Sequence, residues 1–198
     1  MIARILFLLA LAPVAAAQAQ VAPDLTPVVC AWNSFTPERQ AQLRNAFVAD
    51  SSGQDRVLSH NNPGAQETQA AARACGLNYS PTQIADLSGA LGYKATDEMA
   101  RMGIANRGLL KPEIVDRAVA KLSDDRRATI GDRLACPGTA TLQIQWDDSL
   151  ISAMRRTGIR IVDGRTVALI AIAMYAVVAE EGFMRRIAGT APACAPPD

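Results

Sequence analysis

The feature that most constrains this chain is an unbroken apolar run near its C-terminal end, residues Val167–Ala179. A helix that is apolar on every side belongs in the interior of a protein or in a membrane. The run is shorter than the roughly 20 residues that cross a bilayer, and the residues Asp163 before it and Glu180 after it are charged. We therefore expect a buried core helix, continuing to Ile187, around which the other helices pack.

The N-terminal residues have the pattern of a secretory signal peptide. Arg4 supplies a basic start, residues 5–12 are apolar, and the small residues Ala17 and Ala19 suit a cleavage site. We place the cut after Ala19, with Ala17 as the alternative, so that residues 1–19 form the leader. The mature chain, residues 20–198, is then predicted to be periplasmic or secreted and to have no transmembrane segment.

The charge balance argues against a nucleic-acid partner. The sequence has 20 Lys and Arg and 19 Asp and Glu, and removing Arg4 with the leader leaves 19 of each. Binding to a phosphate backbone requires a clearly basic surface. The length suits one domain with its own core, and an aromatic content of only 5% favours closely packed helices over a β-sandwich.

Four cysteines follow the leader, Cys30, Cys75, Cys136 and Cys194, and an even number in an oxidising compartment predicts two disulfides. In an up-and-down unit of three helices, the start of the first helix and the end of the second share one end, which brings Cys30 near Cys75. The ends of the first and third helices also share an end, which brings Cys136 near Cys194. No Cys-x-x-Cys pair occurs and His60 is the only histidine, so we expect neither a metal nor a cofactor.

Cap and turn residues predict the helices that precede the apolar run. The first is expected at residues 35–47, after an extended lead that contains Pro23 and Pro27. The second covers about residues 65–74, and the glycine that follows it suits a left-handed cap.

A third helix begins after Ser80, which starts a capping box. Gly89 and Gly92 weaken this helix, so we expect a kink or a break before Met99. Pro112 opens a fourth helix.

The second half of the chain repeats a pattern of the first. Residues 122–134 align without gaps on residues 35–47, with similar residue types at most positions. This similarity suggests a duplicated three-helix unit, with repeats at residues 35–104 and 122–188.

The predicted fold class is therefore all-α, a single helical-bundle domain of about six to seven helices around the apolar run. A further helix is expected at about residues 147–156, with its acids at the helix start. Residues 139–146 fit a strand as well as a helix, because their apolar positions satisfy both spacings.

Three residues are candidates for acid-base chemistry. Glu180 and Glu181 end the apolar run, where burial would raise a carboxyl pKa toward neutral pH. Arg185 stands one turn after Glu181, so we expect these two to form an ion pair on a wetter face. His60 lies in a polar loop without a serine or cysteine motif, which favours an exposed histidine over a general base.

Two other groups of residues point to binding. Arginine pairs begin at Arg126, Arg155 and Arg185; they could form an anion-binding face, but the balanced charge predicts that acids are interleaved with them. Methionines could either line an adaptable apolar groove or fill gaps between helices. They are Met99, Met102, Met154, Met174 and Met184.

We expect a non-catalytic binding or protein-interaction module, because the sequence has stabilising devices and no constellation of reactive residues. Its partner would be a protein or a small apolar or anionic ligand. The first alternative is a small carboxylate-dependent hydrolase or transferase that uses Glu180 or Glu181. The second is a structural, envelope-associated protein.

Overall fold

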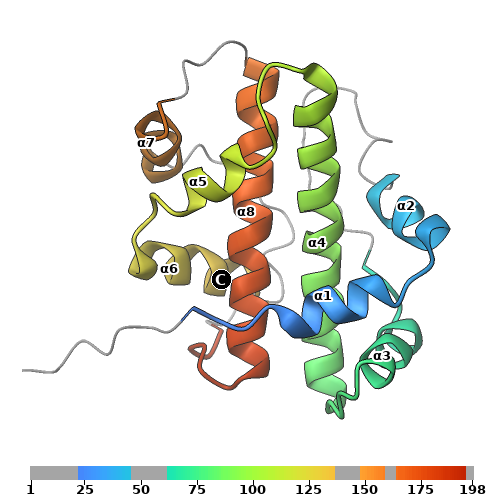
Figure 1. Ribbon diagram of the computed structural model, residues 1–198. Helices are drawn as coiled ribbons and strands as arrows, with labels where there is room; N and C mark the ends of the chain where they lie inside the picture. Colours follow the sequence, from blue (N-terminus) through green and yellow to red (C-terminus); the bar gives the residue numbers. More distant parts are fainter. Residues whose placement is uncertain (1–21, 46–61, 137–147, 159–163, 195–198) are drawn as a thin grey trace, which may run out of the picture.

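A computed structural model describes residues 22–45, 62–136, 148–158 and 164–194 of the protein (Figure 1). Within these ranges the chain forms eight α-helices and no strand, so the predicted all-α bundle is confirmed. The helices are α1 (Thr26–Asn33), α2 (Pro37–Asn45), α3 (Ala65–Ala74), α4 (Pro81–Arg107), α5 (Ile114–Val119), α6 (Asp124–Leu134), α7 (Asp148–Arg156) and α8 (Gly164–Ile187).

Two long helices, α4 and α8, lie side by side at the centre of the molecule (Figure 1). The apolar run lies within α8, and its residues are buried except for three that are half-buried, Ala168, Leu169 and Val177. By length and composition alone α8 could cross a membrane, but 72% of its most apolar stretch of 18 residues is buried inside the structure. The predicted core helix is therefore present, and its apolar surface is covered by other helices.

The six shorter helices form two groups on either side of this central pair. Helices α1, α2 and α3 pack on α4, and helices α5, α6 and α7 lie beside α8 (Figure 1). Two apolar clusters result, one beneath each group. Short helices followed by one long helix thus occur in both halves, an order compatible with the duplication, which stays a prediction.

The sequence predicted an extended segment before the first helix, but this prediction is wrong because residues of that segment form α1. Pro27 lies in the first turn of α1, where proline needs no hydrogen-bond donor and its fixed φ suits a helix. Val28, Ala31 and Trp32 are buried. The apolar contact of these three side chains with α3 and α4 stabilises a short helix that its sequence alone does not announce.

The expected break in the third helix is also wrong, because α4 is one helix of 27 residues. It begins with the predicted capping box at Ser80 and ends at Gly108, whose φ is +65°. Gly89 faces the ring of Phe183, and a Cβ at Gly103 would lie 3.0 Å from Leu169. Gly89, which appeared to weaken the helix, and Gly103 therefore permit the close approach of α8.

Other predictions agree with the structure where it describes them. The second expected helix has the predicted bounds in α3, and α7 matches the helix expected at about 147–156. Residues 139–146 lie outside the described residues, as does His60.

Two disulfides connect elements that are distant in sequence. Cys30 of α1 is bonded to Cys75 after α3, and Cys136 after α6 is bonded to Cys194 in the segment that follows α8. This is the pairing expected from the three-helix geometry. Each disulfide closes a long loop of the chain, which restricts the unfolded state.

Candidate functional site

Charged side chains interrupt the apolar contact between α4 and α8. Helix α4 contributes Lys94, Asp97 and Arg101, which share one face because they are three and four residues apart. Helix α8 contributes Glu180. We refer to these four residues as the α4–α8 charge cluster.

Asp97 is the central acid on α4. It is only 3% exposed, and its Oδ1 accepts a hydrogen bond of 2.7 Å from Arg101 Nε. Lys94 Nζ lies 3.9 Å from its other oxygen. Burial raises the pKa of Asp97, whereas the charges of Arg101 and Lys94 act in the opposite direction.

Arg101 connects this acid to the surface. Its two terminal nitrogens donate to Asp116 of α5 at 3.1 and 2.6 Å. Burial acts against the charge of Arg101, but the hydrogen bonds and charges of Asp116 and Asp97 together raise its pKa. The guanidinium therefore stays charged and joins α4 to α5.

Glu180 has a different environment. Its side chain is buried, and its Oε1 has no hydrogen-bond partner among the described residues. Burial is the main reason why the pKa of Glu180 is raised to about 8; the charges of Lys94 and Arg101 oppose this rise, whereas Asp97 contributes to it. At neutral pH the folded protein thus holds an uncharged, protonated carboxyl between its two central helices.

Glu181 does not form the expected ion pair with Arg185 and does not lie on a wetter face. It is buried and paired with Arg127 of α6, which donates to both carboxylate oxygens. Arg185 instead donates to Asp132 Oδ1 at 2.7 Å and to the carbonyl of Ala128 at 3.3 Å. The i,i+4 prediction fails because α6 lies close enough to supply a better placed partner for each residue.

A contact between two glycines allows that approach. A Cβ on Gly131 of α6 would overlap the carbonyl oxygen of Val178, and a Cβ on Gly182 of α8 would overlap the carbonyl of Gly131. The two backbones therefore touch where α6 crosses α8. The Arg127–Glu181 and Arg185–Asp132 pairs flank this crossing.

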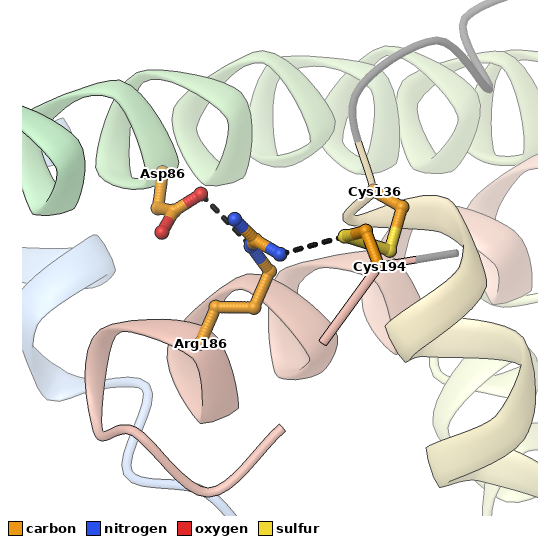
Figure 2. Close-up of a disulfide and its surroundings, with 4 residues drawn as sticks. All are labelled: Asp86, Cys136, Arg186 and Cys194. Carbon is orange, nitrogen blue, oxygen red and sulfur yellow. Dashed lines mark hydrogen bonds and ion pairs between the residues drawn. A yellow bond between two sulfur atoms is a disulfide. The ribbon is translucent and has the colours of Figure 1, made fainter. Parts of the chain in front are cut away.

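The arginine pairs do not form one anion-binding face. Arg127 and Arg185 form ion pairs with acids of the bundle. Arg186 Nε donates a hydrogen bond to Asp86 Oδ1 at 3.0 Å (Figure 2). Arg126 donates to Ser149 Oγ, and Arg156 donates to Ser152 Oγ and to the carbonyl of Lys121. Acids and hydroxyls are thus interleaved with the arginines, as the balanced charge predicts.

The methionines are also separated. Met154 and Met174 belong to the apolar cluster beside α8, and Met184 belongs to the other cluster. Met99 is half-buried, while Met102 is 53% exposed. Their distribution fits gap-filling in two cores rather than one continuous groove.

The sequence identified Glu180 as a candidate buried acid, but it placed Glu181 on a wetter face and did not identify Asp97. A signal was available, because Lys94, Asp97 and Arg101 follow one helical face beside buried alanines. Among the described residues, no group of three or more His, Cys, Asp or Glu could hold a metal ion. What the α4–α8 charge cluster can do chemically is hold a proton on Glu180 and fix the two central helices through Asp97 and Arg101.

Comparison with models of known protein families finds no match, and searches of curated proteins and of solved structures find none either.

Proposed function

We propose that this chain is an exported, non-catalytic binding or protein-interaction module of the periplasm. The observation that carries the proposal is how the charged side chains at helix contacts are used. The Arg101–Asp97, Arg127–Glu181 and Arg185–Asp132 pairs all join helices or turns within the bundle. Groups committed in this way stabilise a scaffold and are not available to a substrate.

The two intramolecular disulfides indicate an oxidising compartment outside the cytoplasm. The N-terminal pattern with Ala17 and Ala19 supports export through a cleaved leader. Expression of the full chain in a bacterium, fractionation, and N-terminal sequencing of the exported product would test this part. A mature chain that begins at residue 20, or at residue 18, is expected; a protein retained in the cytoplasm with residue 1 intact would contradict it.

We expect a protein partner to bind at exposed apolar side chains near the C-terminal end of α4. Met102 is 53% exposed and Leu109, just after the helix, is 48% exposed. A photoreactive amino acid placed at each position should form a crosslink to a discrete partner in the periplasm. The matched control is Arg117, an exposed polar residue of α5.

The partner must then be identified by mass spectrometry, and its binding reproduced with the two purified proteins. Binding that is lost on replacing Met102 by aspartate, but not on replacing Arg117 by aspartate, would support the proposal. No crosslink at Met102 or Leu109, or equal crosslinking at Arg117, would contradict the protein-partner form of it. We would then expect the binding partner to be a small apolar or anionic ligand.

One observation favours the alternative of a carboxylate-dependent hydrolase or transferase. Glu180 has a raised pKa of about 8, which suits a general acid near neutral pH, and one of its oxygens has no partner among the described residues. Its burial acts against this role, because a substrate could reach it only if α4 and α8 separate. If Glu180→Gln abolished function in the cell while fold and crosslinking were unchanged, the catalytic alternative would replace the binding module.

A further inference from the structure

The two disulfides have different surroundings, although all four cysteines are half-buried. At the second disulfide, Arg186 Nη1 donates to Cys194 Sγ at 2.8 Å (Figure 2). At the first, Cys75 packs against the apolar cluster of α1, α3 and α4. One sulfur of the second disulfide thus has a cationic neighbour, whereas the first adjoins apolar side chains.

A cation beside one sulfur decides how a disulfide opens. In thiol–disulfide exchange a thiolate attacks one sulfur and the other sulfur leaves as a thiolate. A nearby arginine stabilises the departing negative charge, and a guanidinium stays protonated in proteins. Cys194 is therefore the favoured leaving group, and Cys136 is the sulfur that is attacked.

We propose that the Cys136–Cys194 bond is a site of thiol–disulfide exchange with an external dithiol, and that Arg186 directs the attack to Cys136. The first thiolate of the dithiol bonds to Cys136 Sγ, the bond to Cys194 breaks, and Cys194 leaves as a thiolate beside Arg186. The second thiolate of the dithiol then attacks the dithiol's other sulfur, which is bonded to Cys136, and Cys136 leaves as a thiolate. Two electrons pass from the dithiol, which becomes a disulfide, and two protons from it complete the two cysteine thiols.

Asp86 is the positioning residue of this site. Its Oδ1 accepts from Arg186 Nε at 3.0 Å, which leaves Nη1 directed at Cys194 Sγ (Figure 2). The disulfide itself ties the segment after α8 to the C-terminal end of α6. Its opening would release that segment while the Cys30–Cys75 bond remains closed, so the group of helices that packs on α4 keeps its own covalent link.

The test uses the folded, oxidised protein and the first disulfide as an internal control. Samples are exposed to dithiothreitol without denaturant, quenched by alkylation at intervals, and mapped by mass spectrometry. We expect Cys136 and Cys194 to be alkylated before Cys30 and Cys75. With the monothiol glutathione in place of dithiothreitol, the trapped adduct should be on Cys136, because a monothiol has no second sulfur to resolve it.

The variant Arg186→Gln distinguishes an electrostatic role of this arginine from a packing role, because the two roles predict opposite changes in the rate at which the disulfide opens. Loss of thiolate stabilisation should slow the opening of Cys136–Cys194 roughly three- to tenfold, with no change at Cys30–Cys75. Arg186→Lys, which keeps the charge, should retain most of the rate. A merely structural arginine would loosen the segment when removed and so accelerate the opening.

Three results would overturn the inference. They are a Cys30–Cys75 bond that opens first in the unsubstituted protein, a glutathione adduct found mainly on Cys194, and an Arg186→Gln variant that opens as fast as the original or faster. Far-UV circular dichroism of each variant establishes that folded proteins are being compared.

Discussion

Replacing Glu180 by glutamine should change how the stability of the protein depends on pH. The pKa of this buried carboxyl is about 8 in the folded protein, against 4.5 for an ordinary glutamate in water. The groups that act on it are Lys94, Asp97 and Arg101 of α4 and Glu181 beside it on α8. Glutamine has nearly the same shape but no ionisable proton, so the substitution removes the titration and leaves most of the packing.

The sign follows from the proton balance. Below pH 4.5 Glu180 is protonated in both states, and its contribution to the free energy of unfolding is fully present. Between pH 4.5 and about 8 the unfolded chain releases this proton while the folded protein retains it, so stability falls as pH rises. At about 1.4 kcal/mol for each pH unit, the interval corresponds to a loss on the order of 5 kcal/mol, and above pH 8 no further loss occurs.

Urea denaturation at intervals from pH 4 to pH 9, followed by far-UV circular dichroism with both disulfides intact, measures this loss. The quantity to plot is the free energy of unfolding of Glu180→Gln minus that of the original protein. It should rise by several kcal/mol up to about pH 8 and then level off, because the other titrating groups cancel in the difference. Glu38→Gln, at an exposed acid of α2, is the matched control because it makes the same substitution outside the core.

A flat difference for Glu180→Gln between pH 5 and pH 9 would refute the reasoning. It would mean that Glu180 is already ionised in the folded protein at low pH, with a partner that compensates for its burial. A difference that falls as pH rises toward 4.5 and is flat above it would be stronger evidence still, since it would give Glu180 a pKa below 4.5 in the folded protein.

Three further predictions follow from the same structure. Gly182→Ala should lower the free energy of unfolding by about 3 kcal/mol or more because its Cβ would overlap the backbone of α6, whereas Gly164→Ala, in open space, should be nearly neutral in the same urea denaturation. Arg127→Met leaves Glu181 buried without its partner and should cost about 2–4 kcal/mol, most of which the double variant with Glu181→Leu should recover; a double variant no more stable than the single one would contradict this. Replacing both cysteines of either disulfide by serine should lower stability by about 4 kcal/mol in calorimetry or urea denaturation, and an unchanged stability would show that the loop closure contributes nothing.

The parts of the fold that the sequence predicts are those determined by local pattern. The apolar run in α8 announces its own burial, and Ser80 with Gln83 marks the start of α4. These signals depend on residues within one turn, or on a period along one helix. Such local signals remain valid however the neighbouring helices pack.

The predictions that fail depend on contacts between helices. Gly89 weakens an isolated helix, but in α4 it faces the ring of Phe183. Pro27 interrupts many patterns, yet it starts α1 because Val28 and Trp32 are buried. At Gly89 the tertiary contact outweighs a local preference of about 1 kcal/mol.

The candidate site shows the same limit with two adjacent glutamates. Side chains of successive helical residues diverge by about 100°, so Glu180 faces the α4 charges while Glu181 faces α6. Which of the two finds an arginine is decided by how closely a third helix approaches. The sequence contains Arg127 and both glutamates, but it does not state that distance.

The distance is set by two residues that carry no charge. Because Gly131 and Gly182 have no side chains, the backbones of α6 and α8 touch, and Arg127, one turn before Gly131, reaches Glu181. A methyl group at Gly182 would force the helices apart and lengthen that ion pair at the same time. Glu181 would then be a buried acid without a close arginine, so Gly182→Ala should cost more stability than the overlap of the two backbones alone accounts for.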